Sequence, residues 1–232
     1  MCYSWLMKIC VPIQVSTQKE VIKRLHQVAK QADLAEIWLD QIKDLNLKTL
    51  LKAKPLPVVC VCKRPADKGK FKGSFEELSR VLLEAIKFGA NYVDIPLNMP
   101  EKLSKKVVQE ARKKKCKVIV SYHDFEGTPD YPKLVKMTQK MTQKGANVVK
   151  LASMTRDLQD MVDIISLGKY LEGSNTRHIL IAMGQKGILS RTLTPTLGGE
   201  MMFATLGKKG QTAPGQLSVK ELKRAWSLIK PK

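Results

Sequence analysis

Short apolar runs and amphipathic segments alternate eight times along this 232-residue chain, and no other feature constrains its fold as strongly. Apolar runs of this kind are typical of strands buried on both faces of a parallel sheet, and the segments between them repeat apolar residues at helical spacing. Eight such units predict an α/β fold, a single (β/α)8 TIM barrel over residues 1–232. The predicted strands are residues 8–13, 34–39, 57–62, 91–97, 118–120, 147–152, 179–183 and 201–206.

A doubly wound open sheet is the alternative to the barrel. Such a sheet usually has fewer strands and carries a glycine-rich phosphate-binding turn after the first. Here the first strand leads into Pro12, Ile13 and Gln14, without glycine. No linker or change of composition divides the chain, and residues 1–7 are expected to form a loose extension before the first strand. A single barrel is therefore favoured.

The cysteines and the apolar runs bear on the location of the protein. No apolar run approaches the roughly 18 residues of a membrane span, and residues 1–7 lack the charged start of a secretion signal. The five cysteines are odd in number, and no pair has zinc-ligand spacing. Buried thiols in a reducing cytosol are the favoured interpretation, over a redox or metal site. We therefore expect a cytoplasmic protein without membrane contact.

The formal net charge is +20, from 41 lysines and arginines against 21 acids. Such a charge can indicate a nucleic-acid partner. The cations are scattered, however, and aromatic residues make up only 6%, with no aromatic–basic pattern for stacking bases. We expect a solvated basic surface that attracts a small anionic substrate rather than nucleic acid.

One stretch, VIVSYHDFEGTP at residues 118–129, places a histidine where barrels place their chemistry. The apolar residues predict a buried strand, and Thr128 followed by Pro129 predicts an N-cap and the first position of a helix. His123 would then lie just past the carboxyl end of the strand. A local structural hydrogen bond is the alternative role for His123, whereas structural roles are favoured for His26 and His178.

A lysine, Lys150, lies inside the apolar run NVVKLA of the next strand. Burying an ammonium is costly, and a site lined by other cations would depress its pKa. A neutral amine could attack a ketone or aldehyde to form a Schiff base, and His123 could remove the proton that the imine makes acidic. The pair therefore predicts either elimination or aldol cleavage, and a lysine that only extends toward solvent remains the structural alternative.

Other polar and apolar side chains would meet these two at the mouth of a barrel. Acids there could instead complete hydrogen bonds in the barrel interior, and Arg191 could pair with a surface acid. The candidates are Glu36, Lys63, Asp67, Asp94, Met183, Arg191, Phe203, Thr212 and Gln216.

Several blocks of sequence resemble the type I 3-dehydroquinate dehydratase family. They are SYHDFEGTP at residues 121–129, GANVVKLA at 145–152, IAMGQKGILSR at 181–191 and APGQ at 213–216, with a weaker match in VVCVCKRPADKG at 58–69. They occur in the order of the family and cover nearly the whole chain. The resemblance implies a (β/α)8 barrel of the shikimate pathway of aromatic amino acid biosynthesis, and it suggests a homodimer.

The resemblance also implies roles for the residues, with no metal or organic cofactor. Lys150 would form the imine and His123 would shuttle the proton, supported by Asp67. Arg191 would hold the substrate carboxylate through its planar guanidinium. Lys63 would contribute to substrate binding, and the remaining contacts would come from Glu36 to ring hydroxyls, from Thr212 and Gln216 in a closing loop, and from Met183 and Phe203 against the ring.

Four positions depart from the pattern of the family. Trp38 and Lys63 stand where members usually carry arginine, Asp67 where they carry glutamate, and Pro96 where they carry an acid. Lysine loses the planar fork of arginine, and Asp67 is one methylene shorter, so it is expected to reach His123 less well. These changes bear on substrate binding and on the support of His123, and leave the Lys150–His123 pair intact.

Two other functions stay open at this stage. A class I aldolase acting on a phosphorylated sugar would share the Schiff-base lysine and would need a phosphate loop, for which residues 184–187 and 198–199 supply glycines. A non-catalytic basic binding protein derived from the barrel would bind nucleic acid in a salt-sensitive way.

Overall fold

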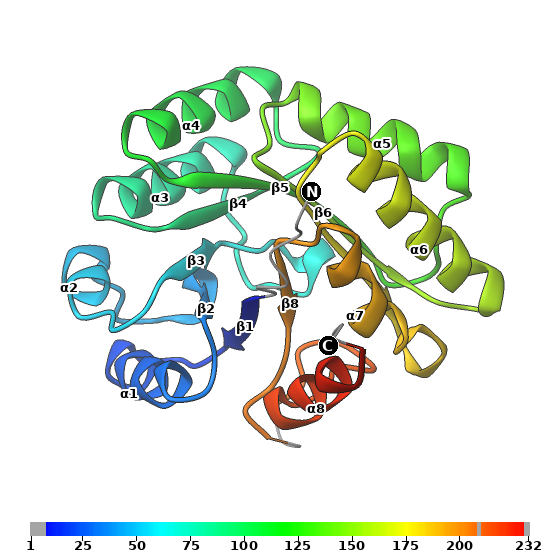
Figure 1. Cartoon of the computed structure of the whole chain (residues 1–232). Helices are drawn as coiled ribbons and strands as arrows, with labels where there is room; N and C mark the ends of the chain where they lie inside the picture. The colour runs from blue at the N-terminus through cyan, green and yellow to red at the C-terminus, as the bar shows by residue number, and fades with distance from the viewer. Residues whose placement is uncertain (1–7, 208–209, 230–232) are drawn as a thin grey trace.

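The structure, a computed structural model, describes residues 8–207 and 210–229. Its eight strands form one parallel sheet in the order β7-β6-β5-β4-β3-β2-β1-β8 (Figure 1). The strands are β1 (Lys8–Ile13), β2 (Leu34–Trp38), β3 (Val58–Val61), β4 (Tyr92–Pro96), β5 (Lys117–Asp124), β6 (Val148–Met154), β7 (His178–Met183) and β8 (Met201–Phe203).

The sheet curls until its two edge strands meet. Between β7 and β8 the contact is a single bridge between His178 and Gly199, where Glu200 N–H donates to the His178 carbonyl at 2.8 Å. The barrel is thus nearly closed, and the predicted (β/α)8 fold is confirmed.

Helices alternate with the strands and cover the outside of the barrel (Figure 1). Their ends follow local capping chemistry, as in the capping box of Ser74 and Glu77 that begins α3. The helices are α1 (Gln18–Ala29), α2 (Leu47–Lys52), α3 (Phe75–Lys87), α4 (Glu101–Lys113), α5 (Tyr131–Gln143), α6 (Leu158–Gly173), α7 (Ser190–Leu193) and α8 (Val219–Ile229).

The predicted start of the helix after β5 is wrong. Helix α5 begins at Tyr131, and its N-cap is Asp130, whose side chain accepts a hydrogen bond from Lys133 N–H at 2.8 Å. The Thr128 hydroxyl instead lies 2.9 Å from the Met154 carbonyl oxygen, to which it donates. Thr128 therefore ties the end of β5 to the end of β6, the two strands that carry His123 and Lys150.

The interior of the barrel is largely apolar, with a few charged side chains buried in it. Strands β2, β3, β4 and β7 are buried along their whole length, as expected for a sheet covered on both faces. Three charged side chains nonetheless lie inside it, each at most 4% exposed: Glu36 from β2, Asp94 from β4 and Lys150 from β6. Charges inside such a core need partners.

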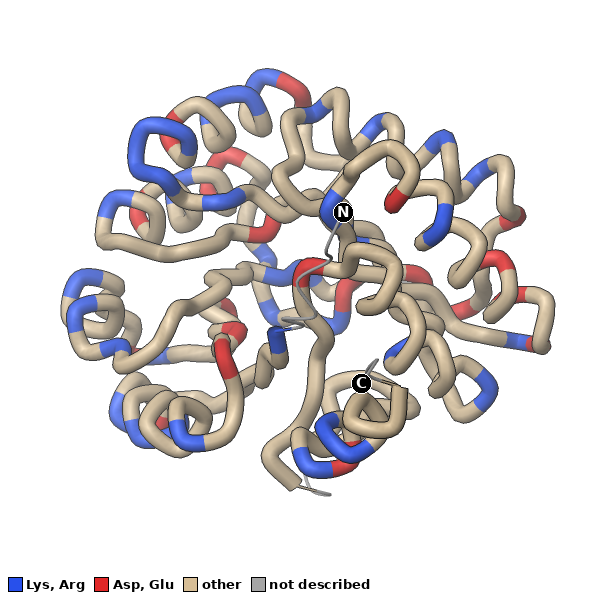
Figure 2. Tube along the Cα trace, in the orientation of Figure 1, with Lys and Arg blue, Asp and Glu red and all other residues tan. Residues whose placement is uncertain are grey.

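Several sequence expectations can be compared with the described residues. Four cysteines are free and buried, namely Cys10, Cys60, Cys62 and Cys116, while Cys2 and the predicted extension 1–7 lie outside the described part. Among the described helices, none has the length and apolar character needed to traverse a bilayer. Lysine and arginine are spread over the outer helices around the barrel (Figure 2).

Candidate active site

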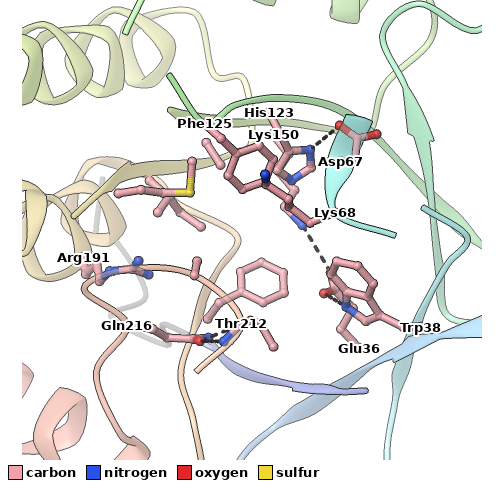
Figure 3. A pocket seen from close by; sticks show the side chains of 15 residues that line it. Glu36, Trp38, Asp67, Lys68, His123, Phe125, Lys150, Arg191, Thr212 and Gln216 are labelled. Carbon is pink, nitrogen blue, oxygen red and sulfur yellow. Dashed lines mark hydrogen bonds and ion pairs between the residues drawn. The ribbon is translucent and has the colours of Figure 1, made fainter. Parts of the chain in front are cut away.

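One pocket at the carboxyl ends of the strands gathers nine of the eleven candidate residues (Figure 3). Strands of a barrel converge at this end, so residues far apart in the chain become neighbours. The pocket is lined by Glu36, Trp38, Asp67, Lys68, His123, Phe125, Lys150, Ala152, Ile181, Met183, Arg191, Phe203, Thr212, Ala213 and Gln216.

Lys150 lies at the base of the pocket between two carboxylates. Its Nζ donates to Glu36 Oε2 at 3.2 Å and lies 3.6 Å from Asp94 Oδ2. Nζ also lies 4.3 Å from the centroid of the Phe203 ring, close enough for a cation–π contact. Burial by itself lowers the pKa of Lys150, but the carboxylates of Glu36 and Asp94 outweigh burial and raise it. The predicted depressed pKa is wrong, because acids rather than cations surround Nζ.

His123 is the last residue but one of β5 and does not lie in the loop beyond it, since the strand runs to Asp124. Its Nδ1 lies 3.5 Å from Asp67 Oδ1 and makes no hydrogen bond. Burial, followed by the nearby Lys63 ammonium, lowers the pKa of His123 despite Asp67. The imidazole is therefore neutral near pH 7 and able to accept a proton. The side chain of Asp67, one methylene shorter than glutamate, brings its carboxylate near the imidazole without forming a hydrogen bond.

Arg191 comes from the short helix α7. It is 1% exposed, and its Nη2 donates to the Pro214 carbonyl at 3.1 Å while its Nε has no partner. Burial lowers the pKa of the guanidinium to about 10, and no carboxylate in the described part of the chain offsets this. A buried cation without an acid is a site prepared for an anion.

The segment that carries Thr212 and Gln216 folds over one side of the pocket. Thr212 N–H donates to Gln216 Oε1 at 2.8 Å, and Gly184 N–H donates to the Pro214 carbonyl at 3.1 Å. Gly215 has φ +73° and approaches Gly184 so closely that a Cβ would lie 2.5 Å from the Gly184 carbonyl oxygen. The loop is thereby docked on the end of β7, next to Arg191.

Of the candidates, Asp94 and Lys63 do not line the pocket, and Lys63 instead pairs with Asp94. Its Nζ lies 2.9 Å from Asp94 Oδ1 and donates to Ser121 Oγ at 3.0 Å, while Ser121 Oγ donates to the same Asp94 oxygen at 2.5 Å. Lys63 is only 3% exposed. It therefore neutralises Asp94 within the barrel and does not line the pocket.

Trp38 fills the wall beside Glu36, and its Nε1–H donates to Glu36 Oε1 at 2.8 Å. The sequence marked Trp38 only as a departure, although residues 36 and 38 share one face of a strand. Lys68 was missed altogether. It follows Asp67 directly, and its Nζ lies 5.1 Å from the centroid of the Phe125 ring at the pocket.

The glycines considered for a phosphate loop are used elsewhere. Gly199 pairs with His178, the first residue of β7, so it lies at the opposite end of the barrel from the pocket. Gly184 N–H is bound to Pro214, and Gly187 N–H donates to the Gly184 carbonyl at 3.2 Å. Gly184 and Gly187 thus use their amides within the protein and Gly199 lies away from the pocket, so these three glycines give no support to the aldolase alternative.

The fold and the pocket define the chain as a (β/α)8 barrel whose mouth combines a buried lysine, a neutral histidine and an unpaired arginine. A family model described as type I 3-dehydroquinase matches residues 9–232. This chain belongs to the type I 3-dehydroquinase family.

Curated relatives agree with the family. The chain is 31% identical over 221 residues to the 3-dehydroquinate dehydratase of Methanococcus maripaludis, which covers 95% of this chain and 99% of the relative. It is 33% identical over 219 residues to a chloroplastic bifunctional 3-dehydroquinate dehydratase/shikimate dehydrogenase of Arabidopsis thaliana, covering 92% of this chain and 36% of the longer plant protein. The chain thus spans about a third of the bifunctional protein and nearly all of the archaeal one.

Solved structures agree as well. The chain superposes with a TM-score of 0.88 on a type I 3-dehydroquinate dehydratase from Clostridium difficile, at 26% identity, covering 96% of this chain and 92% of the other. A 3-hexulose-6-phosphate synthase matches with a TM-score of 0.61 at 20% identity, which indicates a shared barrel fold alone.

Proposed function

We propose that the protein dehydrates 3-dehydroquinate to 3-dehydroshikimate in the shikimate pathway, through an imine on Lys150 with His123 as general base and acid. The observation that carries the proposal is the union of Lys150, His123 and Arg191 around one pocket. Each supplies a different requirement of the reaction: a nucleophile, a proton carrier and an anchor for the substrate anion. Membership of the family supports the choice of substrate.

The first step is imine formation. Lys150 loses a proton, its amine attacks the ring ketone, and the resulting carbinolamine loses water to give an iminium. The iminium draws electrons from the neighbouring carbon, so the hydrogen on that carbon becomes acidic. The carboxylates of Glu36 and Asp94, at 3.2 and 3.6 Å, lie where they stabilise the positive nitrogen.

The second step is elimination. Neutral His123 takes the acidic proton, and the electron pair left behind displaces the hydroxyl on the next carbon. His123 returns its proton to that hydroxyl, which leaves as water, and hydrolysis of the conjugated imine releases the enone and Lys150. The lowered pKa of His123 suits this cycle, since the imidazole starts neutral near pH 7.

Binding of the substrate would rest on groups that surround the reacting pair. The unpaired guanidinium of Arg191 would hold the carboxylate. Glu36 would accept ring hydroxyls, Thr212 and Gln216 would close over them, and Met183 and Phe203 would pack on the ring. Asp67 would support His123 from 3.5 Å, and Lys63 would act through Asp94.

A spectroscopic assay tests the proposal against the two alternatives. Purified protein is mixed with 3-dehydroquinate, and the ultraviolet absorbance of the conjugated enone is followed. We expect steady formation of enone. Absence of enone would overturn the proposal, and salt-sensitive binding of nucleic acid in its place would favour a basic binding protein.

Location and assembly follow as parts of the same proposal. The four buried free thiols are consistent with a reducing cytoplasm. Leu158 at the start of α6 and Leu189 just before α7 are 66% and 55% exposed, which offers apolar side chains for a homodimer contact. The scattered cations provide a general attraction for an anionic substrate rather than a nucleic-acid site. Sedimentation equilibrium would test the dimer.

A further inference from the structure

A chain of two hydrogen bonds connects Trp38 to Lys150 through one carboxylate. Trp38 Nε1–H donates to Glu36 Oε1 at 2.8 Å, and Lys150 Nζ donates to Glu36 Oε2 at 3.2 Å. The three residues are 8%, 3% and 4% exposed, so water competes little for these bonds. Each oxygen of Glu36 thus has its own donor, and the indole determines which oxygen faces the lysine.

We propose that Trp38 is a positioning residue, which holds Glu36 as the proton acceptor that converts the Lys150 ammonium into the attacking amine. This inference rests on the imine chemistry proposed above. It assigns a role to the position where the family usually carries arginine. A neutral indole N–H orients the carboxylate as a guanidinium would, but adds no positive charge beside Lys150.

The proton and electrons balance over the whole of imine formation. One Lys150 proton passes to Glu36 Oε2, and the freed lone pair attacks the ketone carbon. One proton of the attacking nitrogen then moves to the oxygen, Glu36 returns the second, and the oxygen leaves as water as the C=N bond forms. The carboxylate ends ionised, opposite the iminium N–H. The overall change is ammonium plus ketone to iminium plus water.

Asp94 is less suited to the same task. Its Oδ1 is already committed to Lys63 at 2.9 Å and to Ser121 at 2.5 Å, and its Oδ2 lies 3.6 Å from Lys150 without a hydrogen bond. Although burial raises the pKa of Asp94, Lys63 and Lys150 lower it overall, so it accepts a proton poorly. Glu36 is the nearer carboxylate and the one that accepts a hydrogen bond from Nζ.

The groups around Lys150 all have to be considered in a pH experiment. Apart from Glu36, the titratable side chains that face it come from four strands or their ends, and Phe203 of β8 adds only its ring face. They are Cys10 of β1, Lys63 after β3, Asp94 of β4 and His123 of β5. None of these is changed by a substitution at Trp38, so the experiment isolates Glu36.

The test is the pH dependence of imine formation in Trp38→Phe. Protein and 3-dehydroquinate are mixed across a pH series, trapped with cyanoborohydride, and the adduct is quantified by intact mass. Without its anchor the carboxylate rotates away from Nζ, and the ammonium loses its nearest anionic partner. We expect the midpoint of imine formation to move to lower pH by about one unit, and the rate of imine formation above the midpoint to fall because the proton acceptor no longer reaches Nζ.

Trp226→Phe is the matched control. Trp226 lies in α8 at 5% exposure, and its Nε1 has no hydrogen-bond partner. Its replacement removes a buried indole without removing a contact to a carboxylate. The midpoint should equal that of the wild type. β-(3-Benzothienyl)alanine at position 38 keeps the ring shape and removes only the N–H donor, so it serves where Trp38→Phe fails to fold.

A double substitution completes the test. In a Glu36→Gln background, the change at Trp38 should produce no further shift of the midpoint, because the group through which it acts is gone. An unshifted midpoint in Trp38→Phe, or a shift that persists in the Glu36→Gln background, would overturn the inference. A wild type that traps no substrate would overturn the proposed function as well.

Discussion

The two ends of the barrel both carry a buried carboxylate beside lysines, yet they differ in what remains unpaired. At the amino end of the strands, Glu200 Oε1 accepts hydrogen bonds from Lys8 Nζ at 3.0 Å, Tyr92 Oη at 2.6 Å and Lys117 Nζ at 3.0 Å. The two lysines are about half exposed, so solvent still hydrates them. This cluster is complete within the protein.

The carboxyl end combines the same residue types and leaves groups open. Arg191 is 1% exposed without an acid, and His123 Nδ1 lies 3.5 Å from Asp67 without a hydrogen bond. Lys150 shares two carboxylates, and one of them is also held by Trp38. Burial with complete pairing stabilises a fold, whereas burial with unpaired groups indicates a place for a ligand.

Lys150→Ala, at the carboxyl end, is expected to have the largest effect on catalysis of any single substitution. Loss of the nucleophile removes the imine, and kcat should fall by about 10⁴-fold or more. Steady-state assays of enone formation measure this. Lys117→Ala, at the opposite end, is the matched control and should retain wild-type kcat. Near-normal turnover in Lys150→Ala would remove the distinction between the ends.

His123→Ala is expected to have the next largest effect. Removal of the proton carrier should lower kcat by about 10²–10⁴-fold, while the imine still forms. Intact mass after borohydride reduction measures the imine, and His178→Ala provides a comparison on a buried histidine outside the pocket. Loss of the adduct together with turnover would instead place His123 in the imine step.

Arg191→Gln separates binding from stability. Loss of the carboxylate contact should lower kcat/KM by about 100-fold, mainly through KM. Since burial lowers the pKa of this guanidinium to about 10, its removal should also raise the midpoint of thermal unfolding by about 2–4 °C. Calorimetry without substrate measures the second effect. A destabilised variant with unchanged KM would mean that Arg191 is a structural residue.

Glu200→Gln, at the amino end of the strands, is expected to lower stability and to leave catalysis unchanged. Although burial raises the pKa of Glu200, its hydrogen bonds to Tyr92 and the two lysines lower it to about 2. The ionised Glu200 carboxylate therefore stabilises the folded protein. This stabilisation is complete above the unfolded pKa of about 4.5 and is lost as the pH falls toward about 2. At pH 7 the variant should lose about 1–3 kcal/mol of unfolding free energy and keep wild-type kcat, as denaturant titrations and kinetics would report.

Asp67→Glu has the smallest expected effect. One more methylene would allow the carboxylate to hydrogen-bond Nδ1, which raises the pKa of His123. The acidic limb of the kcat/KM profile should move to higher pH, because the base is protonated sooner, and kcat above the limb should rise about five-fold. An unchanged limb would mean that Asp67 already supports His123 as well as glutamate could.

Much of this organisation was predictable from periodicity and motif. The eight strands followed from the apolar runs, and the gathering of Lys150, His123 and Arg191 followed from the barrel these strands form together with the motif blocks around the three residues. The start of α5 could not be predicted in this way. The Thr128 hydroxyl donates to the carbonyl of Met154 in β6, a contact between segments distant in the sequence. The pKa of Lys150 was misjudged for a related reason. The direction of its pKa shift depends on which nearby charged side chains point toward Nζ, and the Lys63 ammonium is paired with Asp94.

The central claim is that Lys150 is the nucleophile of the barrel. Its most direct test is to incubate the wild type with 3-dehydroquinate, reduce with borohydride, digest the protein and locate the modified lysine by mass spectrometry. The account predicts one adduct, on Lys150. An adduct on another of the lysines, or enone formation without any reducible adduct, would contradict it.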